Sequence, residues 1–170
     1  NGKIAYVSNE TSSSLSVIDT SALKVVATIP VAKNPRGIAF SPNGKYAYVA
    51  SEQAEPGVLS VIDVARHRVI KRIPMGERPV GVVVTRDGRR IYVAHGRTNA
   101  VYVIDARTLT ITKKIPVGQR AWYLAFTPDE RRLYVACGRS DSVSVIDVAT
   151  EKVIATVPVG KMPFAVGIQQ

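Results

Sequence analysis

Short apolar segments recur along the chain at a nearly fixed spacing. A Tyr-Val pair begins at residues 6, 48, 92 and 134, so successive pairs are 42, 44 and 42 residues apart. Val-Ile-Asp follows each pair, and an Ile-Pro or Val-Pro pair follows twelve residues after the start of each Val-Ile-Asp. Repeats of this length are typical of propellers and solenoids, in which each repeat is one small structural unit.

Each repeat contains four short apolar runs separated by turn residues. In the second repeat, Pro42-Asn43-Gly44 has the composition of a tight turn, and Pro74 ends the last run because proline cannot extend a strand ladder. The runs are rich in Val, Ile and Tyr, which is typical of strands. No window shows a 3.6-residue apolar period, so we expect no α-helices.

The first and last runs of a repeat differ in polarity. Gly81-Val82-Val83-Val84 is continuously apolar, as expected of a strand buried on both faces, whereas Lys113-Lys114-Ile115 places charge on an outer edge. Four-stranded antiparallel units with this gradient, repeated radially, make a β-propeller. We therefore predict an all-β fold, a single propeller domain over residues 1–170 with four blades of about 42 residues. The blades are expected at residues 1–34 with 163–170, 35–78, 79–120 and 121–162.

The order of the runs predicts how the ring closes. The sequence begins with a second strand (Ile4–Ser8) and ends with a first strand (Phe164–Ile168), so the last strand is expected to complete the first blade. Three arrangements satisfy this count: a closed four-bladed monomer, an eight-bladed ring of two chains, or part of a longer ring. Blades suited to a ring of eight, about 45° apart, would meet poorly at about 90°, which favours the last two arrangements.

These motifs resemble a known repeat family. Tyr6-Val7-Ser8-Asn9, the repeated Val-Ile-Asp, the Ile-Pro-Val-Gly segments and the block Pro35–Gly44 are similar to the YVTN family of β-propeller repeats over essentially the whole chain. The resemblance implies a periplasmic, secreted or cell-surface protein. It also implies a fold related to quinoprotein dehydrogenases, the haem d1 domain of nitrite reductases and some lactonases.

The charge distribution and the single cysteine limit the kinds of partner and of covalent link that are expected. The net charge is +10, but the 23 Lys and Arg residues are spread over every repeat in runs of two at most. This distribution favours general solubility, and we expect no specific nucleic-acid binding. No apolar run approaches the roughly 18 residues of a membrane span. Cys137 has no second cysteine to pair with, and no signal peptide is visible in this sequence.

The candidate site is the mouth of the central channel, where loops from successive blades meet. The fourth positions of the Tyr-Val motifs and the connections between blades are expected there. We predict that a ligand contacts residues from both groups: Arg36, Arg78, His95, Arg120, Trp122, Cys137 and Phe164.

Three features of this set carry alternative interpretations. Trp122-Tyr123 replaces an x-Gly pair of the other repeats, and the indole is either a plug that fills the channel or a stacking platform for a ligand ring. Arg36, Arg78 and Arg120 would bind a carboxylate or phosphate, or would belong to a mixed solvated rim.

His95 and Cys137 would form a metal pair or a thiolate–imidazole couple, or would be strand-end residues without chemistry. No orienting carboxylate repeats beside them, so we predict no catalytic residue, metal site or cofactor. The repeated Asp at the end of Val-Ile-Asp is expected to cap a turn.

Enzyme motifs are missing from the sequence. It contains no Cys-x-x-Cys-His, Gly-x-Ser-x-Gly or His-Glu-x-x-His and no phosphate-binding glycine loop. We therefore predict a non-catalytic binding or scaffold module for a protein, glycan or small anion, with a possible homodimer completing an eight-bladed ring. The alternative is part of a larger propeller enzyme or cofactor-binding domain of the quinoprotein, haem d1 or lactonase type.

Overall fold

The computed structural model describes residues 2–52 and 56–169. These residues form fifteen strands and one short 3-10 helix, arranged as four antiparallel sheets. The all-β propeller predicted from the repeats is thereby confirmed. Among the described residues, there is no helix of the length and apolarity needed to cross a membrane.

Each sheet corresponds to one sequence repeat and is called a blade below. The first blade has three strands: β1 (Ile4–Asn9), β2 (Ser14–Asp19) and β3 (Lys24–Pro30). The second has four: β4 (Pro35–Phe40), β5 (Tyr46–Ser51), β6 (Gly57–Asp63) and β7 (Arg68–Met75).

The third and fourth blades repeat the pattern of the second. The third contains β8 (Pro79–Val84), β9 (Arg90–His95), β10 (Ala100–Asp105) and β11 (Thr110–Pro116). The fourth contains β12 (Ala121–Phe126), β13 (Arg132–Cys137), β14 (Ser142–Asp147) and β15 (Lys152–Pro158), with the 3-10 helix η1 (Gly138–Ser140) between β13 and β14.

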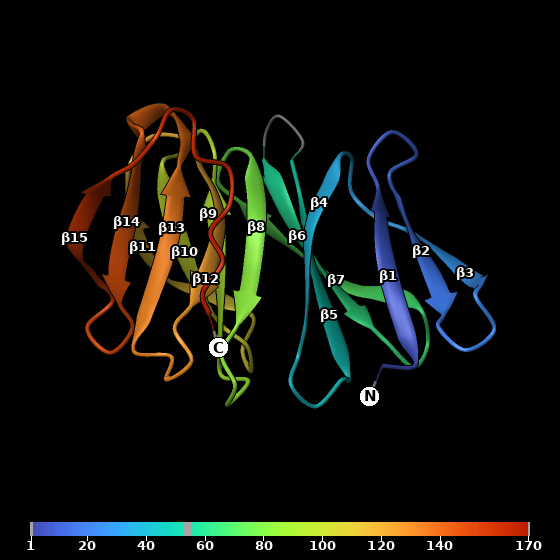
Figure 1. Ribbon diagram of the computed structural model, residues 1–170. Coiled ribbons are helices and arrows are strands. Elements are labelled where there is room, and N and C mark those ends of the chain that lie inside the picture. Colours follow the sequence, from blue (N-terminus) through green and yellow to red (C-terminus); the bar gives the residue numbers. More distant parts are fainter. Residues whose placement is uncertain (1, 53–55, 170) are drawn as a thin grey trace.

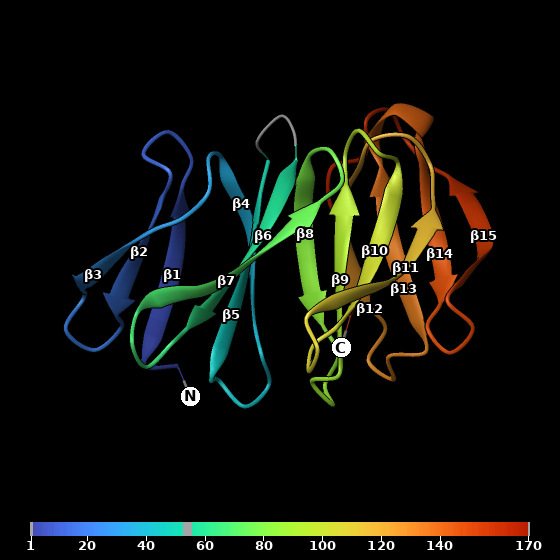
Figure 2. The same ribbon diagram turned by 180° about the vertical axis from the view of Figure 1, so that it is seen from behind.

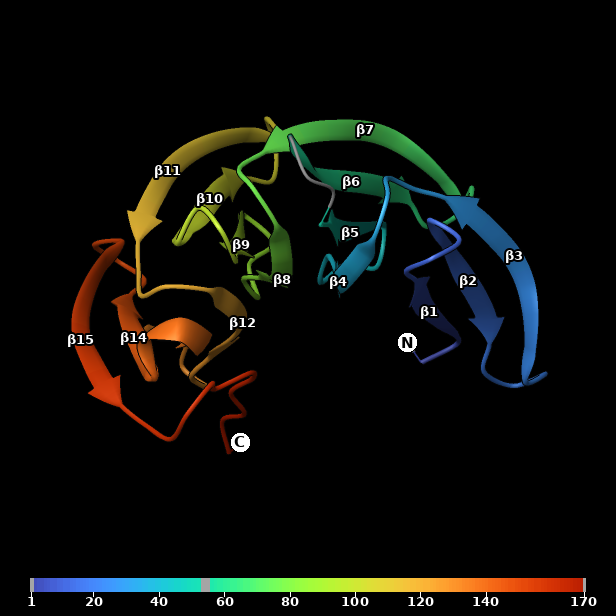
Figure 3. The ribbon, with the colours of Figure 1, turned by 90° about the horizontal axis from the view of Figure 1, so that it is seen from above.

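The blades stand side by side, as Figures 1 and 2 show from opposite sides, and they surround an open centre that is seen from above in Figure 3. Seen from above in Figure 3, β4, β8 and β12 face the centre, and β3, β7, β11 and β15 form the outer rim. Apolar side chains of neighbouring blades meet in three clusters. Leu15 and Val49 belong to the first, Leu59 and Val93 to the second, and Val101 and Val135 to the third. The core therefore lies between blades.

Turn capping by the repeated aspartates is confirmed. The Asp105 carboxylate accepts the backbone N–H groups of Arg107 (2.9 Å) and Thr108 (2.7 Å) and the Thr108 hydroxyl (3.0 Å). Asp147 makes the same contacts with the N–H and hydroxyl of Thr150. These aspartates are thereby occupied in building the turns between the third and fourth strands.

The last segment does not complete the first blade, contrary to the prediction. The first blade contains three strands, and residues 159–169 contain none, so Phe164–Ile168 does not pair with β1. The reason is spatial: β1 lies at one end of the arc, and the C-terminal segment lies beside β12 at the other (Figure 3). The described residues form an open arc, so the closed four-bladed monomer is not formed.

Candidate functional site

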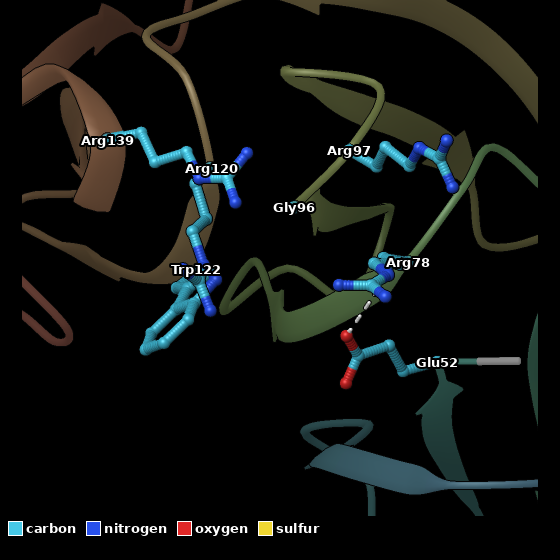
Figure 4. A pocket seen from close by; sticks show the side chains of 7 residues that line it. All are labelled: Glu52, Arg78, Gly96, Arg97, Arg120, Trp122 and Arg139. Carbon is cyan, nitrogen blue, oxygen red and sulfur yellow. Dashed lines mark ion pairs between the residues drawn. The ribbon is translucent and has the colours of Figure 1, made fainter. Parts of the chain in front are cut away.

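A basic pocket opens on the face that carries the loops between second and third strands. Its volume is about 280 Å³, and Figure 4 shows the seven residues that line it. They come from the second, third and fourth blades and from the connections between them: Glu52, Arg78, Gly96, Arg97, Arg120, Trp122 and Arg139. We call this hollow the arginine pocket.

A repeated backbone geometry places two of the arginines. Asn34, Arg78 and Arg120 each precede an inner strand and have left-handed backbones, with φ of 54°, 54° and 60°. Their carbonyl groups accept N–H groups that follow the second strands: Glu52 donates to Asn34 (2.8 Å), Gly96 to Arg78 (2.7 Å) and Gly138 to Arg120 (3.0 Å). Each blade connection is thereby fixed against the strand end that it crosses, and the side chains of Arg78 and Arg120 line the pocket.

Carboxylates compensate two of the four guanidinium groups. Glu52 lies 2.8 Å from Nε of Arg36 and 3.7 Å from Nε of Arg78, so it is shared between them. Arg97 pairs with Glu77 at 2.8 Å. The side of the pocket formed by Arg78 and Arg97 is therefore close to neutral.

The other two guanidinium groups carry uncompensated charge. No carboxylate of the described residues lies within 4.0 Å of Arg120 or Arg139. The Arg120 guanidinium lies over the indole of Trp122, 4.4 Å from the ring centroid, and Arg139 extends from η1. Positive charge is thus concentrated on the side of the pocket nearest the fourth blade.

Trp122 both packs and lines the pocket. Its ring meets Phe164 edge-on, with centroids 4.5 Å apart, and Arg120 stacks on it. The indole Nε1 lies beside Gly96, where an added Cβ would be 3.5 Å away. The indole N–H makes no hydrogen bond to any described residue, so it is a free donor beside the two uncompensated arginines.

His95 lies inside the third blade rather than in the pocket. It is fully buried at the end of β9, and its Nδ1–H donates to the Val93 carbonyl (3.0 Å). The centroid of its ring lies 4.0 Å from the centroid of the Tyr102 ring. Burial lowers the pKa of His95 to about 4, so the imidazole is neutral near pH 7.

Cys137 is also enclosed. Its sulfur lies 3.4 Å from the Val135 carbonyl oxygen and 3.5 Å from Oγ of Ser144, within the core cluster between the third and fourth blades. Neither Cys137 nor His95 lines the arginine pocket. In residues 2–52 and 56–169, no group of three or more His, Cys, Asp or Glu side chains could hold a metal ion.

The structure thus brings part of the predicted set together. Arg78, Arg120 and Trp122 share the pocket, Arg36 adjoins it through Glu52, and Phe164 adjoins it through Trp122. Ligand binding by these residues stays a prediction.

Four lining residues were not in the predicted set: Glu52, Gly96, Arg97 and Arg139. All four lie one or two positions after a Tyr-Val-x-x motif. The fourth motif position points into the blade, as His95 and Cys137 show, so the residues just beyond it are the ones that reach the pocket.

Solved structures with the same architecture include a hydrazine synthase chain from Kuenenia stuttgartiensis. The TM-score is 0.87 and the identity 27%, over 94% of this chain and 47% of that one. A functionally unknown protein from Desulfotomaculum acetoxidans matches with a TM-score of 0.84 at 18% identity, over 96% of this chain and 55% of that one. The present chain therefore spans about half the length of these structures.

Comparison of the sequences themselves gives the family. No curated protein matches the chain. The model of a family described as the YNCE-like beta-propeller matches residues 2–90, which is more than half of the sequence. This match confirms the resemblance to propeller repeats, and the chain belongs to the YNCE-like β-propeller family.

Proposed function

We propose that the protein is a non-catalytic binding module whose arginine pocket takes a small anionic ligand. The observation that carries the proposal is the pairing pattern: Arg78 and Arg97 have carboxylate partners, whereas Arg120 and Arg139 have none among the described residues. Arginine offers a planar fork of donors that fits carboxylate and phosphate groups. A ligand anion would supply the missing partner.

The pocket's size and donors restrict the ligand. A cavity of about 280 Å³ suits a small molecule rather than a chain segment. The uncompensated guanidinium groups of Arg120 and Arg139 and the free indole N–H of Trp122 form a donor set on one wall. We expect a ligand with one carboxylate or phosphate group on this wall and a polar group facing Glu52. A glycan or protein partner would then bind through an acidic group that reaches the same wall.

Anion titration of the purified protein tests the proposal. Trp122 is the single tryptophan of the sequence, so intrinsic fluorescence reports on the pocket. Citrate and inorganic phosphate serve as probes. We expect saturable quenching or enhancement in the wild type, and affinity that falls as salt is added, because screening weakens exposed charge interactions. Hydrogen bonds to charged groups contribute about 1.5–3 kcal/mol each, so Arg120→Gln and Arg139→Gln should each weaken binding roughly 10- to 100-fold.

Arg131→Gln is the matched control. Arg131 is highly exposed in the turn between β12 and β13, away from the pocket, and it pairs only loosely with Asp129 at 3.8 Å. This variant should bind as the wild type does. Equal weakening by all three variants would show a general charge effect, and no response to either anion up to about 10 mM would also overturn the proposal.

A second candidate is supported by the likeness to the hydrazine synthase chain, at 27% identity over 94% of this chain. In this alternative the chain is part of a larger propeller enzyme or cofactor-binding domain. Thiol labelling tests whether Cys137 is available for chemistry. We expect a thiol reagent to label this buried residue only after unfolding in denaturant. Rapid stoichiometric labelling of the native protein would favour the enzyme.

Two further proposals concern the cellular location of the protein and its protein partner. The family resemblance supports a periplasmic or extracellular location. A second copy of the chain is the protein partner that we propose for the open arc.

A further inference from the structure

A larger cavity lies between the second and third blades, on the face opposite the arginine pocket. Its volume is about 690 Å³, and its walls come from the turns after the first and third strands. The turns between β4 and β5 and between β8 and β9 lie at the lower edge of Figure 1. Both blades have all four strands, so the cavity is complete within this part of the chain. We call it the inter-blade cavity.

The other two blade junctions on this face provide an internal control. Between the third and fourth blades, Arg90 pairs with Glu151 at 3.2 Å and donates to the Val148 carbonyl at 3.2 Å. Between the first and second blades, the Tyr6 hydroxyl lies 3.4 Å from Nδ1 of His67. Polar side chains therefore bridge the blades at both of these junctions.

The second junction has different residues at the bridging positions. Tyr46 stands where the third blade has Arg90, and Leu109 stands where the other turns have His67 and Glu151. Leu109, His67 and Glu151 share a left-handed backbone, with φ of 57°, 49° and 52°, so their places in the turn are the same. Among the described residues that line the cavity, no hydrogen bond or ion pair joins one blade to the other. The cavity is also larger than the one at the third junction, which has about 460 Å³.

Tyr46 gives the inter-blade cavity an exposed aromatic surface. It is 39% exposed, whereas Tyr48, which also lines the cavity, is 2% exposed. The backbone of Tyr46 is held in place by Ser41, whose Oγ accepts the Tyr46 N–H (2.9 Å) and whose N–H donates to the Tyr46 carbonyl (2.9 Å). A solvent-exposed ring on a fixed backbone is a surface on which a flat apolar face can stack.

The polar groups around this ring include both donors and acceptors. Asp87 accepts the Thr85 hydroxyl (2.6 Å) and the Arg89 N–H (2.9 Å), which lower its pKa and keep the carboxylate ionised at neutral pH. Asp105 on the next turn is ionised for the same reason, and Arg107 beside it is exposed. Three arginines and two aspartates are among the described lining residues, so opposite charges are mixed. This mixture favours a neutral ligand rich in hydroxyl groups, because each hydroxyl both donates and accepts.

We propose that the inter-blade cavity binds a neutral saccharide, with one pyranose ring stacked on Tyr46 and its hydroxyl groups bonded to Asp87, Asp105 and Arg107. A pyranose ring has an apolar C–H face and a polar rim, which match an exposed aromatic ring bordered by donors and acceptors. The volume lies in the range of small-molecule sites and accommodates a disaccharide. This site is separate from the arginine pocket, and neither depends on the other.

Saturation-transfer NMR and isothermal titration calorimetry of the 170-residue chain test the proposal. The probes are the neutral disaccharides maltose, cellobiose and N,N′-diacetylchitobiose. At least one should bind saturably, and added salt should leave its affinity unchanged, because the ligand carries no charge to be screened. This salt response distinguishes the cavity from the arginine pocket.

Substitution of Tyr46 tests the stacking. Tyr46→Ala removes the ring and should weaken saccharide binding about tenfold or more. Tyr46→Phe keeps the ring and should bind within about threefold of the wild type. The side chain is exposed, so both variants should unfold in urea as the wild type does.

A double variant uses the third junction as its template. Tyr46→Arg combined with Leu109→Glu reproduces the Arg90–Glu151 pair and should bridge the cavity, so saccharide binding is lost while the fold is kept. Arg120→Gln is the control, because Arg120 lines the arginine pocket on the opposite face. This variant should bind the saccharide as the wild type does.

Three results would overturn the proposal. The first is no saturable binding of any of the disaccharides up to about 10 mM. The second is undiminished binding in Tyr46→Ala or in the double variant, which would place the sugar elsewhere. The third is an equal loss in Tyr46→Ala and Tyr46→Phe, which would assign binding to the hydroxyl group and contradict stacking on the ring.

Discussion

The guanidinium group of Arg120 lies over the indole ring of Trp122, 4.4 Å from the ring centroid. A cation in this position is attracted by the ring face, which limits the orientations that a long arginine side chain can adopt. Trp122 therefore orients the charge of its neighbour as well as packing on Phe164. These contacts give Trp122 a packing role, and stacking of a ligand ring on the indole stays a prediction.

Substitution of Trp122 should separate its two contributions to anion binding. Trp122→Phe keeps a ring beneath Arg120 but removes the indole N–H, so citrate affinity should fall about tenfold. Trp122→Ala also removes the stacking, worth about 0.5–1 kcal/mol at exposed sites, and should weaken binding several-fold further. Isothermal titration calorimetry measures both variants, since they lack the fluorescent residue. Unchanged affinity in both would show that the indole does not contribute to binding.

Gly81 should be intolerant of even one added carbon. A Cβ there would lie 2.5 Å from the Trp122 carbonyl oxygen and 3.1 Å from the Tyr123 Cα, both backbone atoms of the next blade. Gly81→Ala should therefore lower the free energy of unfolding by about 1–3 kcal/mol in urea titrations. Gly160→Ala is the control, because nothing lies within 4 Å of its added Cβ, and it should change stability by less than about 0.5 kcal/mol. Equal effects of the two variants would contradict close packing of inner strands.

His95 should make the fold sensitive to mild acid. Its pKa is about 4 in the folded chain and near 6.5 when unfolded, so the unfolded state binds the proton first as pH falls. Stability should therefore decline from about pH 6.5 downwards, with about 2 kcal/mol lost by about pH 5 from this group. Urea unfolding at about pH 7.5 and pH 5 measures the loss. In His95→Asn the difference between the two pH values should shrink by that amount, and an unchanged difference would rule out His95 as its source.

Asp105 should act in the same direction as His95, but at lower pH. Hydrogen bonds from the Thr108 backbone and side chain lower the pKa of Asp105 below 3.8. The ionised cap therefore stabilises the fold above that value, and this contribution is lost as pH falls through the folded pKa. Thermal unfolding at neutral pH should give a lower midpoint for Asp105→Ala, with Asp105→Asn between it and the wild type. Asp147→Ala should behave alike, because that carboxylate makes the same contacts with Thr150.

The fold was predictable because the same strand and turn motifs occur in four sequence repeats. Each Tyr-Val run became a second strand, each Val-Ile-Asp a third, and each aspartate capped the next turn. These features depend on residues that are close together in the sequence, and the nearly fixed spacing of the repeats makes them recognisable. The predicted pairing of Phe164–Ile168 with the first blade was wrong, because this segment and β1 lie at opposite ends of the arc.

The site was predictable only in part, for a geometric reason. The position of Trp122 and Arg120 follows from the blade connections, but the direction of strand-end side chains does not. His95 and Cys137 end equivalent strands, and both turn into the blade, whereas the next residues reach the pocket. The division between paired and unpaired arginines depends on Glu52 and Glu77, whose partners come from other blades or loops. Sequence alone does not fix such long-range distances.

The position of the apolar core between blades has a consequence for how the molecule tolerates change. The hydrogen bonds of each sheet stay within one blade, whereas the three apolar clusters each join two neighbouring blades. A substitution in one cluster should therefore loosen one blade boundary while the strand pairing on both sides of it is kept.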